Sequence, residues 1–472
     1  MRAARGSGPR PSEGSSERHA LVGDGMRGPR VLYVSGSIGL GHVSKDLAIA
    51  RELRRARPDI EIVWLAGHPA SQVLHDAGER VAPECARWVG ASAIAERCTR
   101  GGQLNLVRYV YRSLPSWARN TRLFRAALHA YDIDIAVGNE AWEVDIPLVL
   151  GVLRLPVPFV MIFDFVGCDA MAPNLLDSIG AYALNALWAL DGRVYRDRVC
   201  RGPWHSALFI GEPKDIPDRA LGWALPNRRE HARVHYQFVG HAIGFRPEDF
   251  ADRAAWRHAL GYGEEPLVVC AAGGTSIARD VLELCGAAWL PLRESLPGVR
   301  MVLVCGPRLP VESVRAPEGV EVRGYVPRLH EHFACSDVAV VQCGASSTTE
   351  LAALRRPFVY FPVDGHFEQE IVAARLARYG VGRRMSPSRT TADELAAAIR
   401  GEYARPVTSR PPPPPSLPTD GARNAAKHIL RVLEDRRIGA SRPLHYAAAG
   451  VTGSQSRRCR RVEGRRDDRQ AP

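Results

Sequence analysis

The feature that most constrains the fold of this chain is a repeated alternation of short apolar runs with longer amphipathic stretches. The apolar, β-type runs form two series, at residues 31–35, 61–66, 133–138, 159–163 and 207–211, and at residues 267–271, 300–305, 320–323, 338–342 and 358–361. Stretches with helical periodicity lie between them, for example at residues 43–57, 278–295, 347–355 and 368–379. This alternation is typical of parallel sheets with helices on both faces. The sequence therefore predicts an α/β fold of two doubly wound, Rossmann-like domains that face a central cleft.

The composition along the chain predicts six segments. They are a leader at 1–28, an N-terminal domain at 29–225, a C-terminal domain at 236–402, a Pro-rich linker at 403–420, a helix at 421–437 and a basic tail at 438–472. The run "RPPPPPSLP" is prone to stiff polyproline structure. Both ends are expected to be disordered, and Met26 is a candidate start because it directly precedes the first domain.

The formal net charge of +12 is concentrated at the two ends of the chain. Residues 1–30 carry +3 and residues 437–472 carry +6, so about +3 remains for the folded part. A basic tail is usually a solvated segment. We therefore expect no nucleic-acid partner.

Cysteine usage and hydropathy indicate a cytoplasmic protein. The ten cysteines form no C-x-x-C pair, which favours a reducing compartment. The most apolar segment, residues 146–167, contains Arg154 and three prolines. Such a segment makes a poor spanning helix, so we predict a short helix, a turn and a buried strand there.

The first strand is followed by Gly36, Gly39 and Gly41, and then by His42. The spacing is G-x-x-G-x-G, not the G-x-G-x-x-G of dinucleotide-binding turns, and the second strand ends in Gly67 without an acidic residue for a ribose. Gly39 and Gly41 would let a ligand approach the backbone. The positive end of a helix lowers the pKa of a histidine, so we expect His42 to be a neutral general base. A capping or surface role is the alternative.

A carboxylate partner for His42 should come from another strand end of the same domain. Glu140 and Asp164 each follow an apolar run. Either acid would stabilise the imidazolium that forms when His42 takes a proton. Each could equally be a helix cap or a surface group, and both remain candidate catalytic residues.

Glycines and polar residues also follow three strands of the second series. These residues are Gly273, Gly274, Thr275 and Ser276, then Gly344, Ser346, Ser347, Thr348 and Glu350, and finally Asp364, Glu368 and Gln369. Hydroxyls and free N–H groups at helix starts suit a phosphate, and carboxylates suit sugar hydroxyls. Each residue alone is more often a helix cap, so their joint arrangement carries the prediction.

The pattern G-x-S-[ST]-T-x-E-L…P…P…E-Q in residues 344–369 resembles the donor-binding motif of two-domain GT-B glycosyltransferases. It is most similar to the group of the peptidoglycan N-acetylglucosaminyltransferase and the UDP-glycosyltransferases of natural products. The resemblance implies that Glu350 binds a ribose, that residues 274–276 and 346–349 face a diphosphate, and that Glu368 and Gln369 face the donor sugar. The stretch "RGYVPRLHEHF" similarly implies that Val326 lies beside the base. Ala373 replaces an Asn of the motif, and the Trp-rich box of plant enzymes is absent.

The resemblance implies a hexosyltransferase that uses a UDP-linked or other nucleoside-diphosphate sugar as donor substrate. We expect no metal, because no D-x-D pair follows a strand, and no other cofactor. The acceptor would be the hydroxyl of a small molecule or of a lipid-linked compound. A nucleotide-sugar hydrolase with a similar His-containing loop and a non-enzymatic nucleotide-sugar-binding protein are the alternatives.

The segment 104–130 is basic and aromatic and contains no acidic residue. It predicts a helix pair with two alternative roles. The pair could contact an anionic membrane at the inner face and collect a lipid-linked acceptor, or it could pack on the first domain with solvated arginines.

Overall fold

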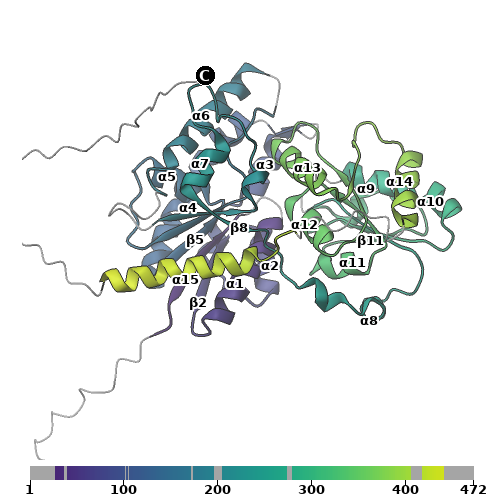
Figure 1. The fold of residues 1–472 in the computed structure, drawn as a ribbon, viewed down its shortest axis with the longest axis horizontal. Helices are drawn as coiled ribbons and strands as arrows, with labels where there is room; N and C mark the ends of the chain where they lie inside the picture. Colours follow the sequence, from purple (N-terminus) through teal and green to yellow (C-terminus); the bar gives the residue numbers. More distant parts are fainter. Residues whose placement is uncertain are drawn as a thin grey trace, which may run out of the picture.

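The computed structural model describes residues 27–36, 40–100, 103–104, 106–171, 174–195, 205–273, 279–405 and 417–440. These residues form two lobes that lie side by side, the first running from purple to teal and the second from teal to green (Figure 1). Each lobe is built around its own parallel sheet with helices on both faces. The predicted α/β architecture of two doubly wound domains is confirmed.

The N-terminal sheet has the strand order β2-β1-β5-β6-β7-β8. Its strands are β1 (Arg30–Ser35), β2 (Glu61–Ala66), β5 (Ile135–Asn139), β6 (Phe159–Phe163), β7 (Ser206–Ile210) and β8 (Tyr236–Gly240). The helices around it are α1 (Gly41–Ala56), α2 (Ala70–Asp76), α3 (Ala91–Cys98), α4 (Leu106–Ala130), α5 (Trp142–Val149), α6 (Leu175–Asp191) and α7 (Arg228–His235). A hairpin of β3 (Thr99–Arg100) and β4 (Gln103–Leu104) precedes α4.

The C-terminal sheet has the order β11-β10-β9-β12-β13-β14. Its strands are β9 (Leu267–Ala271), β10 (Arg300–Val304), β11 (Glu321–Arg323), β12 (Val338–Gln342), β13 (Phe358–Phe361) and β14 (Arg383–Arg384). Its helices are α8 (Arg253–Ala259), α9 (Arg279–Ala287), α10 (Trp289–Ser295), α11 (Leu329–Cys335), α12 (Ala345–Ala353), α13 (Phe367–Tyr379) and α14 (Ala392–Ala404).

Both sheets are apolar on both faces, because successive residues of a strand point to opposite sides. In β1, Leu32 and Val34 pack into one core cluster, whereas Val31 and Tyr33 pack into the cluster on the other face. The second sheet repeats this arrangement, so each domain has two core layers. The layers leave the carboxyl ends of the strands free to carry the loops that face the other domain.

The last helix, α15 (Gly421–Ala440), returns from the C-terminal domain to the N-terminal one. It packs along α1, and Figure 1 draws α15 in yellow. Ala425, Ile429 and Leu433 recur every four residues and are buried in the same cluster as α1. The N–H of His241 donates to the carbonyl oxygen of Pro418 at 2.7 Å, so the two segments that cross between the domains lie side by side.

Several predicted boundaries differ from the structure. The start of the C-terminal domain at residue 236 is wrong, because β8 pairs with β7 and completes the first sheet. Its residues follow the strongly charged α7, which masks the strand in the sequence. The helix expected at 278–295 is divided into α9 and α10, and α15 extends to Ala440. The helix pair expected at 104–130 is the single helix α4. Residues 1–26, 406–416 and 441–472, within the predicted leader, linker and tail, lie outside the described residues.

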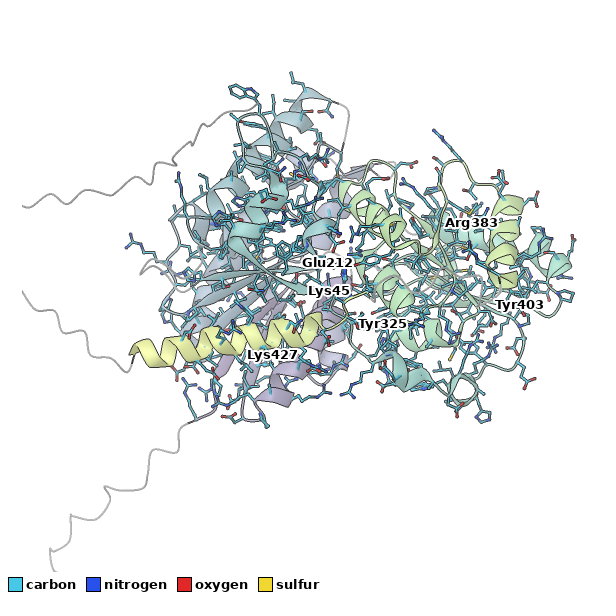
Figure 2. All side chains as sticks on the ribbon, in the orientation of Figure 1. Lys45, Glu212, Tyr325, Arg383, Tyr403 and Lys427 are labelled. Carbon is cyan, nitrogen blue, oxygen red and sulfur yellow. The ribbon has the colours of Figure 1, made fainter. Side chains whose placement is uncertain are left out.

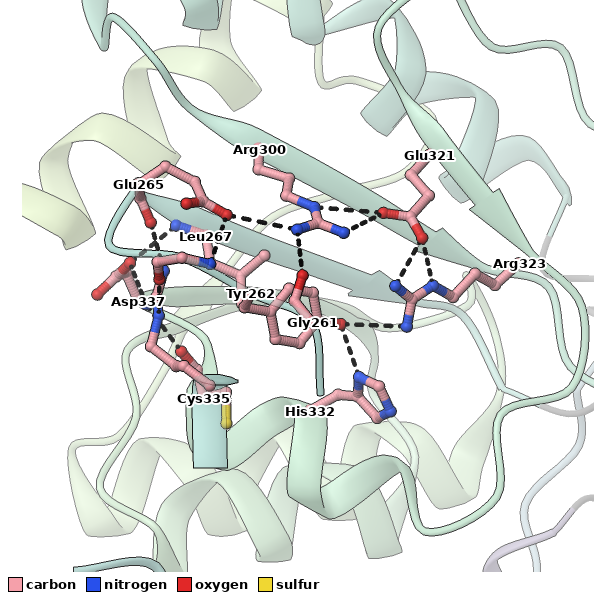
Figure 3. A network of polar contacts seen from close by, with 12 residues as sticks. Gly261, Tyr262, Glu265, Leu267, Arg300, Glu321, Arg323, His332, Cys335 and Asp337 are labelled. Atoms are coloured by element: carbon pink, nitrogen blue, oxygen red, sulfur yellow. Dashed lines mark hydrogen bonds and ion pairs between the residues drawn. The ribbon is translucent and has the colours of Figure 1, made fainter. Parts of the chain in front are cut away.

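A polar network lies at the amino ends of the strands in the C-terminal sheet (Figure 3). Arg300 donates to Glu321 at 2.9 Å, and Asp337 accepts from the N–H of Leu267 at 2.8 Å. These contacts link neighbouring strands at the edge opposite to the ligand-binding ends. We therefore assign the network to the stability of the sheet. Among the described residues, none of the helices combines the length and apolarity needed to cross a bilayer.

Candidate active site

A cleft of about 860 Å³ lies between the two domains, at the carboxyl ends of both sheets. The N-terminal domain contributes residues that follow β1, β5 and β6, and the C-terminal domain contributes residues that follow β9, β12 and β13. The predicted site residues that line the cleft are Gly41, His42, Glu140, Asp164, Gly273, Val326, Gly344, Ser346, Ser347, Glu350, Glu368 and Gln369.

The remaining predicted residues are not part of this lining. Thr348 is fully buried, and its hydroxyl donates to the carbonyl oxygen of Gly344 within α12 at 2.7 Å. Asp364 is exposed and accepts a hydrogen bond from Ser388. The Thr348 hydroxyl and the Asp364 carboxylate thus form local hydrogen bonds, as such side chains commonly do near helix starts. Gly39 and residues 274–276 (Gly274, Thr275 and Ser276) lie outside the described residues.

His42 is buried among three side chains at the strand ends. Its Nδ1 lies 3.2 Å from Asp164 Oδ2 and 3.2 Å from Asn139 Oδ1. Its Nε2 lies 3.6 Å from Glu140 Oε2. The structure therefore brings together all three predicted catalytic residues, with one acid on each side of the imidazole.

Asn139 determines which nitrogen of His42 carries a hydrogen. The amide Nδ2 of Asn139 donates to the buried Asp46 at 2.7 Å, so its oxygen faces His42 and accepts from Nδ1–H. Asp46 is fixed in turn by hydrogen bonds from Ser35 at 2.6 Å and Tyr33 at 3.0 Å. The imidazole Nε2 is thus the atom that can exchange a proton with a ligand.

Two backbone features place these groups. The carbonyl oxygen of Gly41, at the start of α1, accepts a hydrogen bond of 3.0 Å from Ser346 of α12, and a Cβ at Gly41 would lie 2.7 Å from that hydroxyl oxygen. Glu140 has φ = 47°, a left-handed conformation that is costly for a non-glycine residue. Backbone strain of this kind commonly occurs at functional sites, and here it lies at Glu140, whose carboxylate stands beside His42.

The charges in the cluster change the pKa of each member. Burial acts to lower the pKa of His42, but the charge of Glu140 and the hydrogen bond to Asp164 outweigh it and raise the pKa to about 9. The expected lowering by the helix dipole is wrong for this reason. Burial raises the pKa of Glu140 to about 8. Burial would also raise the pKa of Asp164, but Lys45 and His42 hold it well below its usual value.

Beside the His42 cluster, part of the cleft wall built by the N-terminal domain is apolar and rich in aromatic rings. Its lining includes Tyr109, Trp117, Trp142, Phe165, Met171, Leu184 and Trp188. Phe367 of the C-terminal domain closes this side, with its ring 5.2 Å from that of Phe165. This half of the cleft suits an apolar ligand.

The side built by the C-terminal domain is polar. Burial raises the pKa of Glu350 to about 8. The amide oxygen of Gln369 accepts from the N–H of Val363 at 2.8 Å, which leaves its NH₂ group for a ligand. Glu368 and Gln369 follow Phe367 in the first turn of α13, so the polar and apolar halves of the cleft meet there.

Sequence reasoning missed three contributors to the site as well as the role of Asn139. Lys45 and Asp46 stand three and four residues after His42, a spacing that places them on the same face of α1. That spacing was the signal in the sequence that could have placed Lys45 and Asp46 beside His42. Phe367 had no comparable signal, because its partner Phe165 is distant in the sequence and belongs to the other domain.

Two groups of side chains have the geometry of metal ligands among the described residues. They are His42, Glu140 and Asp164, and Glu212, Asp215 and His241. A cationic side chain already contacts each group, Lys45 at Asp164 and Arg378 at Asp215. The first group therefore fits proton transfer directly.

Comparison with known proteins finds a family match within the C-terminal part of the chain. Residues 267–416 match the glycosyltransferase family 28 C-terminal domain. An uncharacterized glycosyltransferase of Methanopyrus kandleri is 28% identical over 163 residues, which are 34% of this chain and 45% of that protein. The match thus spans less than half the length of this relative. The UDP-N-acetylglucosamine–N-acetylmuramyl-(pentapeptide) pyrophosphoryl-undecaprenol N-acetylglucosamine transferase of Mycobacterium tuberculosis is 24% identical over 443 residues, 90% of each chain.

Among solved structures, the glycotransferase of kitacinnamycin superposes with a TM-score of 0.55 at 18% identity. The superposition covers 86% of this chain and 99% of the other, so it includes both domains. This likeness confirms the expected two-domain fold. Residues 267–416 thus resemble the glycosyltransferase family 28 C-terminal domains, and the two described domains have the fold of the GT-B glycosyltransferases.

Proposed function

We propose that this protein transfers a hexose-type sugar from a nucleoside-diphosphate sugar, UDP-linked, to the hydroxyl of a small-molecule or lipid-linked acceptor. The observation that carries the proposal is the position of the buried His42–Asp164 pair in the same cleft as Glu350, Glu368 and Gln369. A proton-accepting group and a sugar-binding group thus face one space. Holding both reactants there would supply much of the rate enhancement.

The donor would bind the C-terminal domain. We assign Val326 to the base, Glu350 to the ribose, the start of α12 at Ser346 and Ser347 to the diphosphate, and Glu368 and Gln369 to the sugar. The free N–H groups of α12 support this assignment, because a helix start attracts a phosphate without a metal. No other cofactor enters the proposal.

The chemistry would proceed at Nε2 of His42. The acceptor oxygen forms a bond to the anomeric carbon, its proton passes to Nε2, and the bond from the anomeric carbon to the diphosphate oxygen breaks with its electron pair on that oxygen. Asn139 and Asp164 hold Nδ1–H during this step. A hydrolase would use the same groups with water as the acceptor.

The apolar half of the cleft supports an acceptor with a large apolar part. The outer faces of the same helices support the membrane alternative. Tyr111 and Leu114 of α4 are 75% and 52% exposed, and Leu175, Leu176 and Ile179 of α6 are also exposed. Arg112, Arg119 and Arg122 are exposed on α4. Apolar side chains beside arginines suit an anionic bilayer, so we propose a cytoplasmic protein that is peripheral at the inner face of the membrane.

The first experiment screens the full chain for thermal stabilisation by UDP-, dTDP- and GDP-sugars. The best donor is then incubated with and without acceptor extracts while the release of nucleoside diphosphate is followed. Release that requires an extract and is lost in His42→Ala supports the transferase. Equal release in buffer alone indicates a hydrolase. Stabilisation without any release indicates a binding protein, and no stabilisation by any donor contradicts all three functions.

A further inference from the structure

Lys45 is a buried cation at the boundary of the two domains, where Figure 2 labels it. It stands one turn after His42 on α1, and its Nζ contacts Asp164 Oδ2. The same carboxylate oxygen lies 3.2 Å from His42 Nδ1. Lys45 and His42 therefore share one oxygen of Asp164, and the lysine is not required to fix the imidazole, which Asn139 also holds.

Lys45 also faces cavities that the C-terminal domain helps to build. It lines the main cleft, and it lines a small neighbouring cavity together with Ser346, Thr349 and Glu368. The hydrogen bond from Ser346 to the carbonyl oxygen of Gly41 brings α1 and the start of α12 together at this point. The ammonium group of Lys45 thus lies in the wall of the cleft that the N-terminal domain builds, and the start of α12 faces the same cleft.

The other Lys and Arg side chains among the described residues that line the cleft have different partners. Arg51 donates to the carbonyl oxygen of Gly244 at 2.7 Å, Arg54 binds both carboxylate oxygens of Glu79, and Arg328 lies 3.2 Å from Glu331. Of these four, Lys45 is the one that shares Asp164 with His42 and lines the small cavity together with Ser346.

We propose that Lys45 Nζ binds the diphosphate of the donor, on the side of the cleft opposite to the start of α12. The inference rests on the proposed function, because it requires a nucleoside-diphosphate sugar. Charge grows on the phosphate oxygen as its bond to the anomeric carbon breaks, and a helix start supplies only about half a positive charge there. The lysine adds a full charge in a water-poor site, and no bond to Lys45 forms or breaks.

The test compares the affinities of nucleoside diphosphates and nucleosides for the full chain by calorimetry, with UDP, dTDP and GDP and their nucleosides as probes. Lys45→Met should weaken the diphosphate by about 10- to 100-fold and leave the nucleoside unchanged, because a charge-assisted hydrogen bond is lost. Lys45→Arg should restore most of the affinity. Arg55→Met, an exposed cation on the same helix, is the matched control and should change neither affinity.

Asp164→Asn separates this role from a purely structural one. If Lys45 binds the diphosphate, removing its carboxylate partner should preserve or tighten that affinity, whereas a lysine that acts only through Asp164 should make Asp164→Asn as weak as Lys45→Met. Equal weakening in these two variants, or unchanged diphosphate affinity in Lys45→Met, overturns the inference. Failure of the wild-type chain to bind any nucleoside diphosphate overturns the proposed function itself. Should Lys45→Met not fold, Lys45→Arg and Asp164→Asn still decide.

Discussion

The hydroxyl of Ser346 in the C-terminal domain donates a hydrogen bond of 3.0 Å to the carbonyl oxygen of Gly41 in the N-terminal domain. This contact lies one residue before His42 and at the start of the helix assigned to the diphosphate. It joins the two halves of the site at the point where donor and acceptor would meet.

Gly41→Ala should break the contact between these halves. The new Cβ would lie 2.7 Å from the Ser346 hydroxyl oxygen, so that hydroxyl must turn away and lose its hydrogen bond to Gly41, or the domains must shift at the cleft. We expect kcat/KM for nucleoside-diphosphate release to fall about tenfold or more, since small misplacements of reacting groups are costly. Ser346→Ala in the same chain removes the clashing atom and should recover part of the loss. If Gly41→Ala retains full activity, the contact has no role in aligning the domains.

The rate should depend on pH through His42. A general base acts in its unprotonated form, so a pKa of about 9 predicts that kcat/KM rises with pH, reaches half its maximum near pH 9 and levels off above it. Glu140 and Asp164, which follow β5 and β6, act on the imidazole together with Lys45 and Asp46 of α1. Glu140→Gln removes a negative charge and should move the rising limb to lower pH.

Lys45→Met should move the same limb in the opposite direction, because the charge of Lys45 acts to lower the pKa of His42. The pH–rate profiles of the wild type and both variants check these signs. A limb that stays in place in Glu140→Gln would contradict the assignment of His42 as the base.

Asn139→Leu should affect stability and turnover together. It removes the partner of His42 Nδ1 and one of the donors to the buried Asp46, so we expect a loss of about 1–3 kcal/mol in the free energy of unfolding and a lower kcat. Tyr33→Phe is the control, because it removes a different hydrogen bond to Asp46. It should lower the stability, measured by urea unfolding, while kcat stays near that of the wild type. A normal kcat in Asn139→Leu would show that Asp164 suffices to orient the imidazole.

Phe367→Ala should act on the acceptor rather than the donor. The ring contacts Phe165 across the cleft and closes the apolar half. Its removal should raise the KM of an apolar acceptor about tenfold and leave the affinity for the nucleoside diphosphate unchanged, because that ligand binds elsewhere in the cleft. Steady-state kinetics in which the donor and acceptor concentrations are varied separately measure the effect on each substrate. Equal effects on both substrates would place Phe367 in the donor site.

The exposed apolar residues of α4 and α6 should support binding to anionic vesicles. Replacing Tyr111, Leu114 and Ile179 with Ser should reduce sedimentation with vesicles that contain phosphatidylglycerol, because the apolar side chains no longer enter the bilayer interface. Leu290→Ser is the control, since Leu290 is also 52% exposed but lies on α10 in the other domain. If the wild type does not sediment with the vesicles, α4 is a helix packed on the domain with solvated arginines.

The sequence by itself determined the α/β class, the two-domain organisation and most strand positions, because buried parallel strands are continuous apolar runs that can be recognised locally. It also placed His42, Glu140 and Asp164 after strands of the first sheet and Glu350 after a strand of the second, since the carboxyl ends of parallel strands share one edge of their own sheet. The resemblance in residues 344–369 pointed to the donor.

The tertiary structure alone decided how these ends combine. The raised pKa of His42 depends on two carboxylates that are about 100 residues away in the chain, whereas the helix dipole, which suggested the opposite shift, is a local effect. The assignment of β8 to the first sheet depends on pairing with β7, which no local pattern encodes. The contacts of Ser346 with Gly41 and of Phe367 with Phe165 across the cleft arise only when the domains meet. Local periodicity specifies elements, whereas charge coupling and closure of the cleft are long-range properties of the folded chain.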